Sequence, residues 1–130
     1  MAFNFDATDC PDLFPPLVAL ASNANGTSKI VGVNRLLHKE SNRALTLQKE
    51  FEKAKVKITL EGDEMFIEGR KEFDTAQFHS HGDHRIAMAC TILAMKTKGK
   101  CIVEHAEAVN KSYPQFYEDL KKINGKIVNL

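Results

Sequence analysis

Two halves of the sequence repeat one another, and this repeat limits the fold more than any other feature. Matched residues recur at one constant spacing: Ile30-Val31 with Ile102-Val103, Lys39 with Lys111, and Val56 with Val128. Asp12 and Asp83 fall one residue short of that spacing. A recurring segment of this kind indicates one structural unit used twice. We therefore expect a single domain over residues 1–130, with repeat units at roughly 1–70 and 71–130.

Hydrophobic periodicity divides each unit into strands and helices. The order is strand, helix, strand, helix, strand, strand, and then the same order again without the last strand. Strands are expected across residues 3–8, 28–33, 56–60, 65–68, 75–78, 100–103 and 126–128. Helices are expected from near Pro16 to Ser22, over 44–54 behind Ser41 as N-cap, over 86–95, and around Phe116, Leu120 and Ile123. This order predicts an α/β (α+β) fold.

The stretch Ser80 to Arg85 combines polar and flexible residues directly ahead of the apolar run 86–95. The expected geometry is a strand, a tight turn at Gly82, and a helix enclosed on nearly all sides. Backbone N–H groups and Arg85 would project from the helix start, where the helix dipole favours anions. The stretch therefore predicts a phosphate or carboxylate site.

Composition excludes several functional classes. The 130 residues include 18 basic and 17 acidic side chains, and this near neutrality argues against wholesale nucleic-acid or membrane binding. No run has the length of a transmembrane helix, and residues 1–6 lack the basic and apolar regions of a signal peptide. The 3 cysteines lack CxxC spacing, which is typical of reduced thiols. We therefore expect a cytoplasmic protein.

Charged clusters stand just before the predicted helices, and they allow two interpretations. The clusters are Asp12, Lys39-Glu40 with Arg43, Asp83-His84-Arg85, and Lys111. In the first interpretation the aspartates complement helix dipoles and the cations are solvated surface charges. In the second, the basic residues bind an anion, since cations at helix starts oppose the dipole and are misplaced for stability. Carboxylates beside them can then transfer protons.

A zinc site is a further alternative, because residues 79–84 match the pattern H-x-H-x-D-H of metallo-β-lactamase-like hydrolases. Such a site needs more His or Asp ligands well downstream and a larger sandwich. His105 is the one histidine that follows His84. The pattern also leaves Lys39, Arg43 and Lys111 without a role. We therefore expect no metal at this motif.

Four segments in one order and at one set of spacings carry a family resemblance: Cys10-Pro11-Asp12, Lys39-Glu40-Ser41-Asn42-Arg43, Gly82-Asp83-His84-Arg85-Ile86-Ala87-Met88 and Asn110-Lys111-Ser112-Tyr113-Pro114. Together they resemble the C-terminal part of the 5-enolpyruvylshikimate-3-phosphate synthases (3-phosphoshikimate 1-carboxyvinyltransferases), the glyphosate-sensitive enzymes of the shikimate pathway. The resemblance covers essentially the whole chain. It implies repeated βαβαββ units, three per domain in two domains, and no cofactor.

The resemblance also implies a reaction. Members of the family transfer the enolpyruvyl (carboxyvinyl) group of phosphoenolpyruvate to the 5-hydroxyl of shikimate 3-phosphate, through a tetrahedral intermediate, and release phosphate. The product leads to chorismate and the aromatic amino acids. On this mapping Asp12 would act on the 5-hydroxyl and Glu40 would be the acid–base group for the phosphoenolpyruvate methylene. Lys39 would lie between the two substrates, and both Asp12 and Lys39 would contact shikimate 3-phosphate.

The same mapping implies a phosphoenolpyruvate site. Arg43 and Arg85 would hold the substrate carboxylate with His84 alongside, and Lys111 would contact the phosphate. Asn42 stands where the family commonly has aspartate.

The family enzyme is much longer than this chain, and its N-terminal portion contributes further substrate-binding residues. We therefore expect a partial domain that needs the N-terminal part of the same enzyme as its partner and is inactive alone. A non-catalytic anion-binding or assembly module of the same fold is the alternative.

Overall fold

The structure is a computed structural model that describes residues 1–123 and 127. The first half of the chain contains strand β1 (Asn4–Asp6), helix α1 (Phe14–Ser22), strand β2 (Thr27–Val31), helix α2 (Arg43–Glu52) and strands β3 (Ile58–Glu61) and β4 (Glu64–Glu68). The second half contains β5 (Gln77–His79), α3 (His84–Ala94), β6 (Ile102–Glu104) and α4 (Phe116–Lys122). Short 3₁₀ helices η1 (Pro11–Leu13), η2 (Val33–Leu36) and η3 (Ala106–Lys111) lie between them. The expected α/β class is confirmed.

The strands of the described residues form two separate sheets. The first has the order β1-β2-β4-β3, in which β1 and β2 are parallel and the hairpin of β3 and β4 is antiparallel. The second consists of the parallel pair β5 and β6. Phe5 lies opposite Ile30 in one parallel pair, and Phe78 lies opposite Val103 in the other, at the same separation along the chain. Each parallel pair is joined through a helix, as parallel strands require.

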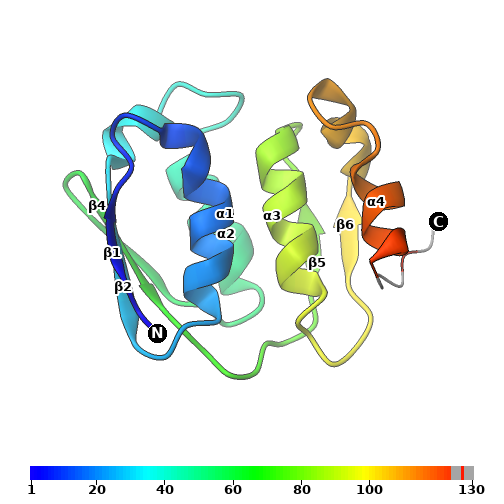
Figure 1. Ribbon diagram of the computed structural model, residues 1–130, viewed down its shortest axis with the longest axis horizontal. Coiled ribbons are helices and arrows are strands. Elements are labelled where there is room, and N and C mark those ends of the chain that lie inside the picture. Colours follow the sequence, from blue (N-terminus) through cyan, green and yellow to red (C-terminus); the bar gives the residue numbers. More distant parts are fainter. Residues whose placement is uncertain (124–126, 128–130) are drawn as a thin grey trace.

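Helices α1, α2 and α3 lie between the two sheets (Figure 1). In that view α1 and α2 lie beside the four-stranded sheet, α3 occupies the middle, and β5, β6 and α4 lie on its other side. One hydrophobic core crosses from α1 and α2 to α3, and its fully buried members include Phe14, Phe51, Phe78, Ile86 and Leu93. Burying each side chain of this size contributes roughly 1.5–3 kcal/mol. Residues 86–94 of the apolar run are buried or half-buried as expected, whereas Met95 follows the end of α3 and is 43% exposed.

Three local expectations are wrong. Helix α1 begins at Phe14 rather than near Pro16, because N–H groups of the first turn need no intrahelical partner and prolines fit there. Asn42, not Ser41, caps α2, and its side-chain oxygen accepts from the Leu45 N–H at 3.3 Å. Ile123 lies past the end of α4 and is 73% exposed, whereas Phe116 and Leu120 are buried. The expected strand at 126–128 lies outside the described residues, apart from Ile127.

The predicted turn at Gly82 is present and involves two residues. His81 has φ of 55° and Gly82 has φ of 68°, both in the left-handed region. That region is easy for glycine and strained for histidine. Ser80 is buried and fixes the turn, since its hydroxyl donates to the His105 carbonyl at 2.8 Å and accepts from the Gly82 N–H at 3.2 Å. The turn delivers the chain directly into α3.

Candidate anion-binding active site

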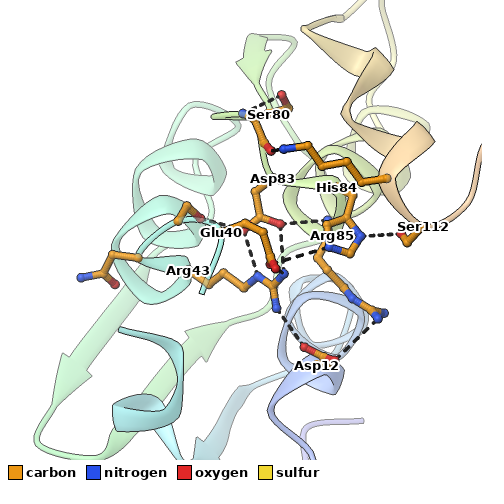
Figure 2. Close-up of polar contacts among 12 residues, drawn as sticks. Asp12, Glu40, Arg43, Ser80, Asp83, His84, Arg85 and Ser112 are labelled. Atoms are coloured by element: carbon orange, nitrogen blue, oxygen red, sulfur yellow. Dashed lines mark hydrogen bonds and ion pairs between the residues drawn. The ribbon is translucent and has the colours of Figure 1, made fainter. Parts of the chain in front are cut away.

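Arg43, the first residue of α2, lies at the centre of a cluster of carboxylates (Figure 2). Its side chain is 1% exposed. Nε donates to Oδ2 of Asp83 at 2.9 Å, and Nη2 reaches Oδ1 of the same carboxylate at 3.2 Å. Nη1 donates to Asp12 Oδ1 at 2.9 Å, and Nη2 also donates to Glu40. Burial acts to lower the pKa of Arg43, but Asp83, Glu40 and Asp12 outweigh it and raise that pKa, so the guanidinium stays charged.

Asp83 is a buried carboxylate that joins α3 to this cluster. It is the N-cap of α3, and its Oδ1 accepts from the Arg85 N–H at 3.0 Å. Ser41 donates a further hydrogen bond to Oδ2 at 2.8 Å. Burial acts to raise the pKa of Asp83, but Arg43 and Ser41 outweigh it, so the pKa lies below its ordinary value. Asp83 therefore remains ionised inside the protein and holds Arg43 with both oxygens.

The start of α3 adds two more functional side chains. The His84 ring hydrogen-bonds to the Ser112 hydroxyl through Nδ1, and its Nε2 lies 3.6 Å from Glu40 Oε2. The Arg85 guanidinium reaches Asp12, with Nη2 at 3.6 Å from Oδ2. Arg85 Nε is buried and has no hydrogen-bond partner among the described residues. An unpaired buried donor is costly, so this atom is suited to an incoming acceptor.

The two lysines lie at the margin of the cluster. Lys111, at the end of η3, donates to the Gly82 carbonyl. A cleft of about 310 Å³ lies beside it and is lined by His79, Gly82, His105, Glu107, Ala108 and Lys111. Lys39 is half-buried and makes no hydrogen bond or ion pair with the described part of the chain. Lys111 is thus tied to the turn before α3, while Lys39 remains available for a ligand.

Most of the predicted site residues converge. Contacts connect Asp12, Glu40, Arg43, His84 and Arg85 in one network, although the sequence places them in three separate segments. Two contributors were not foreseen: Ser41, which the sequence suggested as a helix cap, and Ser112, which carries no recognisable signal of its own. The linking role of Asp83 was not predicted either, because a helix-start aspartate is most often only a cap.

The H-x-H-x-D-H residues do not converge as a zinc site. His81 Nε2 lies 2.8 Å from Glu50 Oε2, and His79 Nδ1 accepts from the His81 N–H at 2.8 Å. Among the described residues the one group of possible metal ligands is Glu40, Asp83 and His84, whose ligand atoms lie within 4.8 Å of one another. Arg43 already pairs with both oxygens of Asp83 and with Glu40, so a cation occupies this position.

The arrangement suits small organic anions with acidic or basic chemistry around them. Two guanidinium groups supply planar, bidentate donors for carboxylate or phosphate, and Asp12 and Glu40 are 54% and 45% exposed, so both carboxylates are accessible from solvent. No helix of the described residues combines the length and apolar character needed to cross a membrane.

Sequence comparisons identify relatives of this chain. The family model for EPSP synthase (3-phosphoshikimate 1-carboxyvinyltransferase) matches residues 2–120. A 3-phosphoshikimate 1-carboxyvinyltransferase from Clostridium acetobutylicum is 39% identical over 122 residues, which are 94% of this chain and 28% of that protein. The same enzyme from Lactiplantibacillus plantarum is 42% identical over 123 residues, 91% of this chain and 28% of its own length. The chain therefore spans about 28% of the length of these curated relatives.

Comparisons of structure agree with those of sequence. An EPSP synthase from Acinetobacter baumannii superposes with a TM-score of 0.78 at 29% identity, over 84% of this chain and 26% of that one. The enolpyruvyl transferase NikO from Streptomyces tendae superposes with a TM-score of 0.74, over 96% of this chain and 28% of that one. At 17% identity the second likeness concerns the fold alone.

Proposed function

The chain belongs to the EPSP synthase family, and on this premise we propose that it forms one wall of an enolpyruvyl transfer site. The reaction moves the enolpyruvyl group of phosphoenolpyruvate to the 5-hydroxyl of shikimate 3-phosphate and releases phosphate. The observation that carries the proposal is the buried Arg85 Nε, which lacks a partner among the described residues. It lies in a network that already holds two arginines and two accessible carboxylates.

Four basic side chains would bind phosphoenolpyruvate. Arg85 and Arg43 would grip its carboxylate, with His84 beside them, and Lys111 would contact its phosphate. Arg43 is held by Asp83 through Nε and Nη2, which leaves its Nη1 and Nη2 edge directed at Asp12 and Glu40. The substrate carboxylate would therefore replace Asp12 and Glu40 on this edge, while Asp83 keeps the guanidinium in place.

The displaced carboxylates are the proton-transfer groups of the proposal. Asp12 would accept the proton of the 5-hydroxyl while the hydroxyl oxygen attacks C2 of phosphoenolpyruvate. Glu40 would deliver a proton to the methylene carbon and later recover it as phosphate leaves and the double bond re-forms. Lys39, which makes no hydrogen bond or ion pair with any described residue, would lie between the two substrates and contact shikimate 3-phosphate. Substrate binding would thus place both carboxylates at the reacting atoms.

Partial length limits what this chain does alone. Because it spans about 28% of its curated relatives, the full reaction is proposed for a longer protein that contains this wall. The 130-residue chain is expected to show no useful turnover of the two substrates, since positioning by the remaining residues supplies a large part of the rate. A phosphate-release assay that gave normal turnover with the purified chain would contradict this statement.

Calorimetric titration tests the binding half of the proposal. The chain should bind phosphoenolpyruvate in preference to unrelated anions, and Arg85→Gln should weaken that binding roughly tenfold to a hundredfold through loss of a charged donor. Lys98→Gln is the matched control, because Lys98 is an exposed cation whose one ion-pair partner among the described residues is Glu72. Equal weak binding of all anions, unaffected by Arg85→Gln, would favour a non-catalytic module instead.

A further inference from the structure

Glu50 is a buried charge that the proposed reaction does not use. It lies on α2 with its side chain 0% exposed. Oε1 accepts from Lys53 Nζ and from the His79 N–H, each at 2.8 Å, and Oε2 lies 2.8 Å from His81 Nε2. Burial acts to raise the pKa of Glu50, but Lys53, His81 and the His79 N–H outweigh it and lower that pKa. These three donors therefore stabilise a charged carboxylate inside the protein.

Two of those donors belong to the segment that enters α3. The His79 N–H lies at the end of β5, and His81 is the first left-handed residue of the following turn. A histidine at φ of 55° is strained, and it keeps this conformation only where its surroundings hold it there. The imidazole contact with Glu50 supplies such a restraint, and the His81 N–H adds another by donating to His79 Nδ1 at 2.8 Å.

The same face of α2 holds this segment at a second point. Arg43 and Glu50 are seven residues apart, which places them on one side of a helix two turns from each other. Arg43 binds Asp83, and Glu50 binds His79 and His81, so the two contacts flank the turn. The turn presents the carboxylate of Asp83 and the main chain of Arg85 to the anion site. The positions of these two groups therefore depend on both contacts.

We propose that Glu50 and His81 are positioning residues for the anion site, acting through the left-handed turn at 81–82. Their contact fixes where α3 starts, and therefore where Asp83 meets Arg43 and where Arg85 projects. The role of Asp83 and Arg85 in an anion site rests on the proposed function. The effect of the Glu50–His81 contact on their positions does not. Neither Glu50 nor His81 would contact substrate.

Hydrogen exchange measured by NMR on the full chain tests the coupling. Glu50→Gln removes the charge, and His81→Gly removes the imidazole while tolerating positive φ. In both variants the Arg43 Nε–H and the Arg85 amide should exchange roughly tenfold to a hundredfold faster. This change corresponds to the free energy of one buried hydrogen bond to a charged group. Amides of β2 and β4 should keep their rates. Glu72→Gln is the control, because Glu72 is an exposed glutamate paired with Lys98.

Two results would overturn the proposal. One is unchanged exchange of both reporter groups in His81→Gly. The other is equal acceleration of the β2 and β4 amides, which would mean that the contact stabilises the whole fold and positions nothing in particular. Titration with phosphoenolpyruvate on the same samples separates this inference from the proposed function. If the unaltered chain failed to bind the ligand, the proposed function would be in error, while the exchange comparison would still decide the positioning role.

Discussion

Replacing Asp83 by asparagine tests the buried pair at the centre of the site. Asparagine keeps the shape of the side chain and is as good an N-cap as aspartate, so the cap of α3 on the Arg85 N–H is retained. What is lost is the negative charge facing Arg43 and the acceptor Oδ2, because an amide NH2 then faces Arg43 Nε and the Ser41 hydroxyl. The variant therefore removes the ion pair while it keeps the helix cap.

The size of the effect follows from the surroundings of Arg43. Removing one partner of a buried ion pair costs about 3–5 kcal/mol when the other charge is left alone. Here Asp12 and Glu40 still contact Arg43, so its charge remains partly compensated. We expect Asp83→Asn to lower the free energy of unfolding by about 2–3 kcal/mol. Asp83→Ala also removes the cap and should cost about 1 kcal/mol more.

Urea denaturation at several pH values provides the assay. Because the folded-state pKa of Asp83 is lowered, its contribution is complete above the ordinary aspartate pKa and is lost as the pH falls through the folded-state value. The difference between the unaltered chain and Asp83→Asn should therefore be full at pH 7 and shrink below about pH 4. Asp74→Asn, at an exposed position, is the control. A cost at pH 7 no larger than that of the control would refute the reasoning.

Three further predictions concern the backbone, the ligand and the thiols. Gly69→Ala would place a Cβ 1.8 Å from the Ala24 carbonyl oxygen, so thermal melting should show severe destabilisation, whereas Gly62→Ala meets no neighbour within 4 Å and should cost about 1 kcal/mol. In a full-length enzyme carrying this segment, Lys111→Ala should weaken phosphoenolpyruvate binding, and Asp12→Ala should abolish turnover with a smaller loss of binding; near-normal turnover of the latter would remove Asp12 from its proposed role. Burial raises the pKa of Cys90, so a thiol reagent at pH 8 should modify the other two cysteines and leave Cys90 unmodified until the chain unfolds.

Local sequence patterns were sufficient to predict much of this fold. The apolar run 86–95 indicated a buried helix, and Gly82 indicated the turn before it, because both signals depend on neighbouring residues alone. The charges ahead of the helices predicted where polar groups gather. Helix ends were less predictable: Asn42 and Ser41 are both good caps, and a tertiary contact with Asp83 decided which of them caps α2.

The pairing of charges could not be predicted in the same way. Arg43 looked like a free anion-binding cation, yet it is buried among carboxylates that lie far from it in the sequence. Glu50 carried no recognisable signal in the sequence, because its burial depends on His79 and His81 from the other half of the chain. Periodicity reports which face of a helix is buried, but it does not report which distant group will cover that face.

The long sequence separation between Arg43 and Asp83 has a consequence for the order of folding. The β3–β4 hairpin closes a very short loop and can form early, whereas joining α2 to the start of α3 requires closure of a long one. The β3–β4 hairpin is therefore expected to form before Asp83 meets Arg43. During that interval the Arg43 guanidinium, later buried against Asp83, is still in contact with water.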